Sequence, residues 1–219
     1  MGTTQAPSAI RCFLDASDRA GLWIVGVGAA LVALTHTVSM VISAQRIFGH
    51  DPLAVEGIPF SDDSVPEFTE HLPAITEARY EAVTAVVEGV PSAARWLLWG
   101  AEATGSLAAI GVCLALIWLC VRVARQRPFG RSATVALLIT AALVMVGGVL
   151  PQMLAAMGRA EVVDHLGVAE MVAEQGRGMV MSFSLELSLA PIGIGLALGV
   201  VAAAFEIGER LQRDTQGLV

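Results

Sequence analysis

The sequence predicts an all-α fold: a four-helix transmembrane bundle with a partly helical extracytoplasmic segment between the first and second helices. The 219 residues are 55% hydrophobic, and the apolar residues gather in four runs, each long enough to cross a hydrocarbon core of about 30 Å as a helix. None of these runs alternates as the strands of a membrane β-barrel do. The four predicted spans, all within one domain covering residues 1–219, are residues 22–44, 96–121, 133–156 and 180–205.

The first run, residues 22–44, is expected to remain in the protein as a membrane anchor. Its 23 residues exceed the roughly 7–15 of the apolar core of a signal peptide. A cleavage site also needs small residues, and the candidate site Ile42-Ser43-Ala44 begins with a bulky one. Arg11 and Arg19 precede the run, which favours a cytoplasmic amino terminus.

Residues 46–94 form a long acidic segment that we place outside the cytoplasm. This segment holds nine acidic residues, against Arg46 and Arg79 as its only basic ones. Because short loops rich in arginine stay in the cytoplasm, an acidic segment of this length between two spans is expected on the opposite side.

Two short helices are expected inside this acidic segment. Ser64-Val65-Pro66-Glu67 has the capping-box pattern that starts a helix, and that helix should end before Pro73. A second helix is expected over residues 74–89 from four apolar residues at helical spacing. These residues are Tyr80, Val83, Val87 and Val90.

The short segment between the second and third runs is expected to lie in the cytoplasm, because it holds four arginines and no acid. Both termini then also lie inside. The same arginines can bind anionic lipid headgroups, at about 1 kcal/mol each, and the sequence does not separate that role from a topology signal. All thirteen basic residues of the chain are arginine, which suggests a GC-rich bacterial genome and hence a bacterial inner membrane. The four loop residues are Arg122, Arg125, Arg127 and Arg131.

Polar side chains inside the predicted spans are the candidate functional site. Charged groups are expensive in hydrocarbon, so those that occur there usually face a bundle interior or a cavity. Each span has one polar group of this kind, three of them roughly 10–12 Å below the exterior surface at 1.5 Å per helical residue and the fourth, Gln152, slightly shallower. We therefore predict that the four converge in one polar cluster in the outer half of the bundle. They are His36, Glu102, Gln152 and Glu186.

Three interpretations of this cluster stay open. The side chains can form a structural hydrogen-bond network between helices, they can bind a proton, a cation or a ligand, or they can take part in catalysis. Arg95 lies seven residues before Glu102, on the same helix face. It is therefore a further candidate partner for this carboxylate.

No catalytic, metal or cofactor site is predicted. A haem held by two histidines needs both within the membrane, and only His36 meets this condition. The chain has no G-x-S-x-G, P-loop or G-x-G-x-x-G pattern. Cys12, Cys113 and Cys120 form no C-x-x-C pair, and we interpret the last two as packing residues. Direct nucleic-acid binding is not expected either.

Three segments resemble the DUF2975 family of bacterial four-helix membrane proteins. Residues 90–98 open the second span, Arg-Gln-Arg-Pro-Phe-Gly at 125–130 precedes the third, and residues 204–219 close the chain. The resemblance covers most of the chain. The family has no established activity, and some of its members are encoded beside small helix-turn-helix regulators. The resemblance thus implies a sensing or regulatory role and supplies no catalytic residue.

The leading hypothesis is a non-enzymatic accessory or sensory membrane protein. Its expected partners, besides the lipid bilayer, are another membrane protein, a cytoplasmic regulator or a second copy of the chain. The alternative is a small transporter or an ion- or ligand-binding membrane protein, which requires a hydrated path to Glu102 and Glu186. Small residues in the spans permit close helix contacts within or between chains. They include Gly100, Gly193, Gly195 and Gly199.

Overall fold

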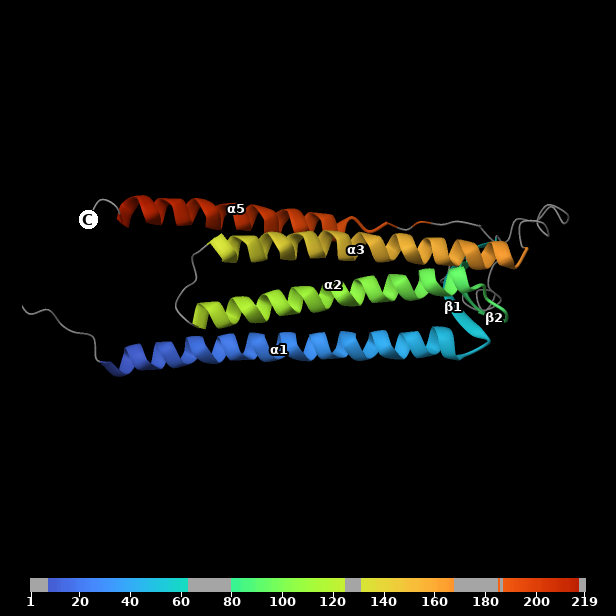
Figure 1. The fold of residues 1–219 in the computed structure, drawn as a ribbon, viewed down its shortest axis with the longest axis horizontal. Coiled ribbons are helices and arrows are strands. Elements are labelled where there is room, and N and C mark those ends of the chain that lie inside the picture. The colour runs from blue at the N-terminus through green and yellow to red at the C-terminus, as the bar shows by residue number, and fades with distance from the viewer. Residues whose placement is uncertain (1–7, 63–79, 125–130, 168–184, 186, 217–219) are drawn as a thin grey trace, which may run out of the picture. The chain divides into compact units, whose positions relative to one another are not determined.

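The computed structural model describes residues 8–62, 80–124, 131–167, 185 and 187–216 (Figure 1), and the side chains of residues 20–58, 82–124, 132–167, 185 and 187–208. In chain order the elements are α1 (Ser8–Gly49), β1 (Leu53–Asp62), β2 (Tyr80–Val87), α2 (Ser92–Ala124), α3 (Arg131–His165) and α5 (Ala190–Gln216).

Each of the four helices contains a stretch that is long and apolar enough to cross a membrane, which confirms the prediction of four apolar helices. These stretches are Ala20–Gly49, Ser92–Ala124, Ser132–His165 and Ala190–Gly208.

α5 begins at Ala190, and residues 187–189 directly before it are not helical, so the predicted span 180–205 is not one continuous helix. Proline is tolerated in the first helical turn, where its missing N–H costs no hydrogen bond, and Pro191 occupies that turn. The Leu189 carbonyl accepts hydrogen bonds from the amides of Ile192 and Gly193, at 3.0 and 3.2 Å, and so starts the helix.

The chain forms two compact units. The hairpin unit comprises Ser39–Gly105 and Val149–Ser188, and the helical unit comprises Met1–Val38, Ser106–Gly148 and Leu189–Val219. The hairpin unit therefore contains both strands with the end of α1, the start of α2 and the end of α3. The helical unit contains the remaining parts of these three helices together with α5.

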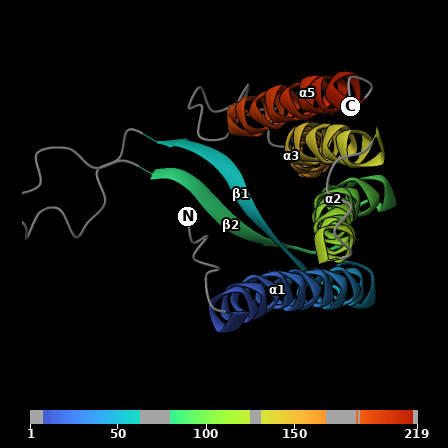
Figure 2. The same cartoon turned by 90° about the vertical axis from the view of Figure 1, so that its left-hand side faces the viewer.

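Within the helix predicted over residues 74–89, the structure has β2, the second strand of an antiparallel hairpin, so the prediction is wrong over Tyr80–Val87. Residues 74–79 lie outside the described residues. β2 pairs with β1 from Leu53↔Val87 to Asp62↔Tyr80, and Figure 2 shows the two strands as a twisted ribbon. Val87 is buried, whereas Val86 is 66% exposed. This alternation is the period of a strand, in which β-branched residues are favoured. The helix predicted from Ser64 lies outside the described residues.

A bulge in β1 adjusts the register of the hairpin. Between Val55 and Ile58 the first strand has one residue more than its partner, and Gly57 takes a positive φ of 72° in this stretch. Such a bulge needs a residue that adopts the left-handed region without strain, which glycine does. The guanidinium of Arg159, from α3, lies 3.3 Å from where a Cβ on Gly57 would be, so the bulge also packs closely on that helix.

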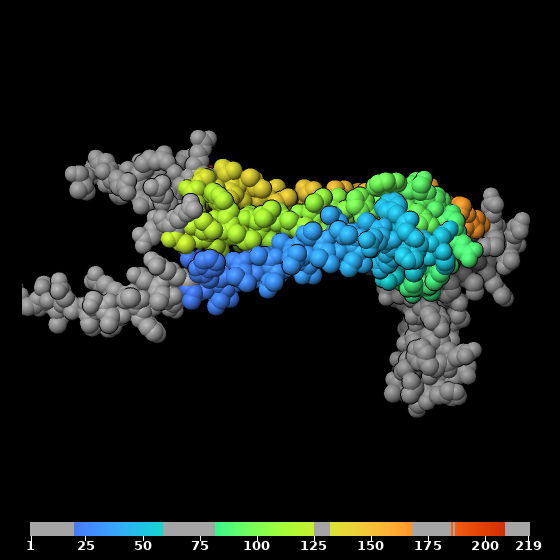
Figure 3. All heavy atoms as spheres, turned by 60° about the horizontal axis from the view of Figure 1, so that its bottom comes forward, coloured from blue at the N-terminus to red at the C-terminus, as the bar shows by residue number. Residues whose placement is uncertain are grey.

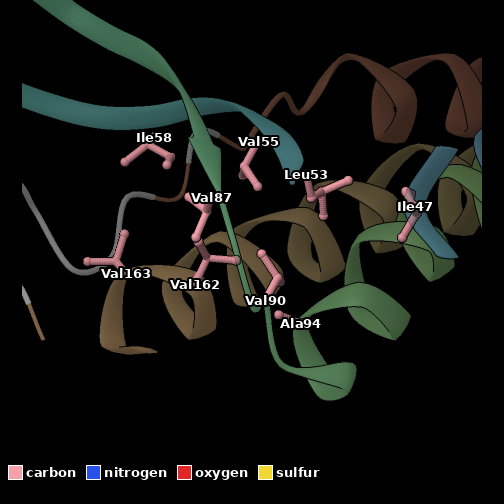
Figure 4. Packing of buried hydrophobic residues seen from close by; sticks show 9 residues of the cluster. All are labelled: Ile47, Leu53, Val55, Ile58, Val87, Val90, Ala94, Val162 and Val163. Carbon is pink, nitrogen blue, oxygen red and sulfur yellow. The ribbon is translucent and has the colours of Figure 1, made fainter. Parts of the chain in front are cut away.

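The core of the hairpin unit joins the hairpin to the ends of three helices (Figure 4). Val162 and Val163 of α3 are at most 2% exposed, and Figure 4 shows Val87 of β2 beside Val162. The contacts of these buried side chains tie the two strands and all three helix ends into one hydrophobic cluster. The members of the cluster are Ile47, Leu53, Val55, Ile58, Val87, Val90, Ala94, Val162 and Val163.

In the helical unit, α3 packs against α2 and against α5 through adjacent glycines. A Cβ on Gly147 would overlap Ala108 of α2, and a Cβ on Gly148 would overlap Pro191 of α5. A Cβ on Gly195 of α5 would in turn overlap the Met145 side chain of α3 and would lie 3.0 Å from the carbonyl oxygen of Ala141. Of the glycines noted in the sequence, Gly195 makes the expected close contact. A Cβ on Gly100 would be in ordinary van der Waals contact with Leu154, and a Cβ on Gly193 or Gly199 would meet no atom within 4 Å.

Candidate functional site

Glu102, on α2, forms an ion pair with Arg46 in the last turn of α1. The carboxylate Oε1 lies 3.5 Å from the Arg46 Nη2, and the two side chains are 44% and 60% exposed. The predicted first span ends at residue 44, but α1 continues to Gly49. The added helix carries Arg46 to a position from which its side chain reaches Glu102, so the carboxylate has a cation as its partner.

Gln152, on α3, holds the chain that precedes α5. Its Oε1 accepts a hydrogen bond of 2.7 Å from the Ser188 amide, and its Nε2 donates one of 3.5 Å to the Ser188 carbonyl. The amide side chain therefore pairs with both backbone groups of one extended residue, as a neighbouring strand would. Those backbone groups would otherwise lack intrahelical partners, because Ser188 precedes the first turn of the helix.

The predicted convergence of four polar residues remains a prediction. His36 lies half-buried on α1 in the helical unit, whereas Glu102 and Gln152 belong to the hairpin unit. Glu186 lies outside the described residues. Its predicted depth is therefore not tested.

The threonines on either side of His36 satisfy their hydroxyls within the helix. Thr35 Oγ1 donates to the Leu31 carbonyl at 3.0 Å, and Thr37 Oγ1 donates to the Ala33 carbonyl at 2.8 Å. Bonding to the carbonyl four residues earlier lets a hydroxyl lie in apolar surroundings without an external partner. These two threonines therefore give no indication of a ligand near His36.

The side chain of Arg95 donates four hydrogen bonds, none of them to Glu102, the candidate partner from the sequence. Its Nη1 donates to the carbonyls of Ile47 at 2.6 Å and His50 at 3.1 Å, and its Nη2 donates to Asp51 Oδ1 at 2.9 Å. The Nε donates to the Val90 carbonyl at 3.2 Å. Arg95 is therefore not paired with Glu102.

The position of Arg95 explains its role. Carbonyls at the end of a helix lack partners within that helix, and a cation there also favours the helix dipole. Arg95 thus caps the end of α1, while Asp51 Oδ1 also accepts a hydrogen bond of 3.3 Å from the Gly89 amide. The side chain of Arg95 is only 14% exposed, so this network fastens both ends of the hairpin to α1 and α2. The feature of the sequence that could have indicated this role is the position of Arg95 directly after the acidic segment 46–94.

Three aromatic rings pack together beside this network. Phe48 lies 4.8 Å from Trp96 and 6.1 Å from Trp99, measured between ring centroids. Trp96 and Trp99 are 5.6 Å apart with nearly perpendicular planes. Aromatic rings are enriched where a membrane meets water. The three rings therefore place the hairpin end of the helices at such a boundary if the chain spans a membrane.

The arginines of the predicted inner loop are described in part. Arg122, at the end of α2, lies over the Trp118 ring, 5.2 Å from its centroid, and its Nη1 donates a hydrogen bond to Ser132 Oγ at the start of α3. Arg125 and Arg127 lie outside the described residues, as does the side chain of Arg131, the first residue of α3.

Among the described residues, no three His, Cys, Asp or Glu side chains come together as a metal site would require. A scan against protein-family models and searches of curated proteins and of solved structures find no match to the chain.

Proposed function

We propose that this chain is a multi-pass membrane protein with a non-enzymatic accessory or regulatory role. In this proposal the hairpin lies outside the cytoplasm, both termini lie inside, and the membrane is that of a bacterium. The charge asymmetry of the sequence supports the orientation, because nine acids lie on the hairpin side and four arginines lie in the short loop on the other. The resemblance to the DUF2975 family agrees with this role.

The Glu102–Arg46 pair is the observation that carries the non-catalytic, non-transporting role. A carboxylate that couples transport to a proton or cation has to exchange its partner during the cycle. Glu102 has a cation from α1 at 3.5 Å, and Gln152 is bonded to the backbone of Ser188. Both polar groups thus hold chain segments together, as the structural interpretation of the cluster requires.

The hairpin offers a physical route for a regulatory signal. Its apolar face shares one core with the ends of α1, α2 and α3, and Arg95 links both ends of the hairpin to the same helices. A partner that bound the exposed face of the hairpin would therefore act on three helix ends at once. The partner that we propose at the hairpin is another membrane protein or a second copy of the chain, whereas a cytoplasmic regulator would bind on the opposite side of the membrane.

Photo-crosslinking in native membranes tests this proposal. A photoreactive residue at Val86, which is 66% exposed on β2, should capture a defined partner, whereas one at the buried Val87 should not. The Arg95→Gln variant should reduce the capture at Val86, because it loosens the hairpin. Recovery of the uncrosslinked monomer alone from Val86 would contradict the proposal.

A further inference from the structure

The hairpin has two outer edges, one along β1 and one along β2. In the described part of the chain the two strands pair only with each other, so no third strand lies against either edge. An unpaired edge presents a row of N–H and C=O groups, which is a template for pairing with a further strand. Figure 3 shows both strands at the surface of the molecule, β1 in cyan and β2 in green.

The edge of β1 has protective features that the edge of β2 lacks. Between Val55 and Ile58, and again between Pro59 and Asp62, β1 advances by one residue more than β2, so both irregularities lie in β1. Bulges and prolines are the features by which proteins protect an edge strand from further pairing. β2 contains neither proline nor glycine, and half of its residues are valine or threonine, which favour strands. The edge of β2 is therefore the one suited to accept a strand.

Pro59 also indicates which residues of β2 direct their backbone groups outward. In an antiparallel pair, facing residues alternate between those that bond to each other and those whose N–H and C=O point away. Proline is tolerated in an edge strand where its missing N–H would face outward, and Pro59 is paired with Ala82. By the same alternation, the outward backbone groups of β2 belong to Ala82, Thr84 and Val86. The side chains of all three are exposed as well.

The charge beside this edge favours a basic partner. Glu56 of β1 and Glu88, directly after β2, are exposed, and neither has an ion-pair partner in the part of the chain that the structure describes. The segment 46–94 as a whole holds nine acidic residues against two arginines. A second copy of the chain would bring the same negative charge to the edge and be repelled, whereas a strand with Arg or Lys side chains would be attracted.

From these observations we infer that the edge of β2 binds an extended, basic segment of another membrane protein, which adds to the hairpin as a third strand. Hydrogen bonds to the outward backbone groups of Ala82, Thr84 and Val86 supply the affinity, and the charges of Glu56 and Glu88 select Arg or Lys side chains. This inference rests on the proposed function, because it specifies the chemistry of the partner that we propose at the hairpin.

Peptide binding to the full chain in phosphatidylcholine nanodiscs tests the inference, with empty nanodiscs as the blank. The probe is a fluorescent peptide of alternating Val and Arg, and its reference has Glu in place of Arg. We expect saturable binding of the basic peptide, followed by fluorescence anisotropy, and none of the acidic one. A basic peptide methylated on every backbone nitrogen should bind more than about tenfold more weakly, because it cannot form the hydrogen bonds of a strand. Equal binding of the methylated and unmethylated peptides, or of the acidic and basic ones, would overturn the inference.

Two matched proline variants locate the edge that binds. Val86 and Ala54 face each other across the hairpin, so Val86→Pro removes an outward N–H from the edge of β2 and Ala54→Pro removes one from the edge of β1. Val86→Pro should weaken binding of the basic peptide more than about tenfold, whereas Ala54→Pro should leave it unchanged. Equal effects of the two variants would contradict the inference. If Val86→Pro does not fold, the comparison with the methylated peptide still decides.

Three glutamine variants test the charge preference. Glu56→Gln and Glu88→Gln should each weaken binding of the basic peptide by up to about fivefold, the effect of one exposed charge pair. Glu206→Gln, in the helical unit, is the control for removing one negative charge elsewhere and should leave binding unchanged. Unchanged binding in a variant that carries both Glu56→Gln and Glu88→Gln would contradict a basic partner.

Native mass spectrometry without peptide tests whether a second copy occupies the edge. We expect a monomer in wild type and in Val86→Pro. A wild-type dimer that Val86→Pro dissociates would assign the edge of β2 to a second copy and overturn the inference. If the basic peptide does not bind but Val86 still captures a partner in native membranes, this inference fails and the proposed function stands. Failure of both experiments would reject the proposed function as well.

Discussion

Gly147 of α3 lies so close to Ala108 of α2 that a methyl group on the glycine would overlap the alanine methyl. Membrane helices associate through van der Waals packing without a hydrophobic driving force between them, so close approach at small residues carries much of the interaction. The next residue, Gly148, makes the equivalent approach to Pro191 of α5. Two consecutive glycines therefore let α3 pack on two neighbours.

We expect Gly147→Ala to destabilise the protein by about 1–3 kcal/mol, the usual cost of overpacking a tight contact. Gly199→Ala is the matched control on α5, because a Cβ at Gly199 meets no atom within 4 Å. Thermal unfolding in detergent, followed by circular dichroism, would measure both. Equal midpoints for the two variants would show that α2 and α3 are not in close contact at Gly147.

The strand register of the hairpin predicts opposite results at adjacent valines. Val87→Asp should destabilise the hairpin unit by about 3–5 kcal/mol, because it buries an unpaired charge, whereas Val86→Asp should change stability by less than about 0.5 kcal/mol. Val87 is 5% exposed and Val86 is 66% exposed. Limited proteolysis of the hairpin in the two variants would measure the difference. Similar sensitivity in both would argue against the alternation of buried and exposed positions.

The four helices could be predicted from the sequence because an apolar run longer than 18 residues has few other solutions. β2 could not, since Val83 and Val87 lie four residues apart and fit one face of a helix as well as one face of a strand. What decides between them is the pairing with β1, a contact between segments distant in the sequence. Periodicity alone does not contain that information.

Two polar residues of the site could also be predicted from the sequence, but their bonding partners could not. Glu102 and Gln152 can be identified in the sequence because polar groups are costly in hydrocarbon. The groups that they bond to cannot be identified in this way. Arg46 lay beyond the predicted end of α1, and two residues of additional helix were enough to bring it within reach of Glu102. Arg95 donates hydrogen bonds to the backbone carbonyls of Ile47 and His50. Every residue has a backbone carbonyl, so the sequence does not indicate which ones accept these bonds.

Arg95→Gln should destabilise the hairpin unit by about 2–3 kcal/mol, because hydrogen bonds from a charged group are lost. The part-buried carbonyls of Ile47 and Val90 are then left without this donor. Arg46→Gln is the control, since an exposed ion pair is worth about 0–1 kcal/mol and both partners of this pair are exposed. Amide hydrogen exchange of β1 and β2 would report local opening. If Arg46→Gln destabilised the hairpin unit as much as Arg95→Gln, Arg95 would not be the residue that anchors the hairpin to α1 and α2.

The proposed orientation predicts which positions a membrane-impermeant thiol reagent reaches in intact cells. Single cysteines introduced in a background without native cysteines should react from outside at Phe60, and only after permeabilisation at Phe129 and Thr215. The reason is the excess of arginine in the loop around Phe129. Reaction at Phe129 in intact cells would reverse the orientation.

Glu102→Gln separates a structural carboxylate from a functional one. The Glu102 and Arg46 side chains are 44% and 60% exposed, so loss of the ion pair should cost less than about 1 kcal/mol. An amide still accepts a hydrogen bond from Arg46. We therefore expect the variant to fold and to retain partner capture at Val86. Glu56→Gln, at an exposed position of β1, is a control for removing one negative charge from the hairpin unit.

The same variant tests the transporter alternative through Trp99, which lies on α2 one turn before Glu102. If Glu102 is structural, the pH dependence of tryptophan fluorescence in nanodiscs should be the same in wild type, Glu102→Gln and Glu56→Gln. A proton- or cation-dependent change in wild type that is lost in Glu102→Gln and kept in Glu56→Gln would identify a titrating site at Glu102. Such a result would favour the ion-binding role, because the carboxylate would then exchange its bond to Arg46 for a proton or a cation during function.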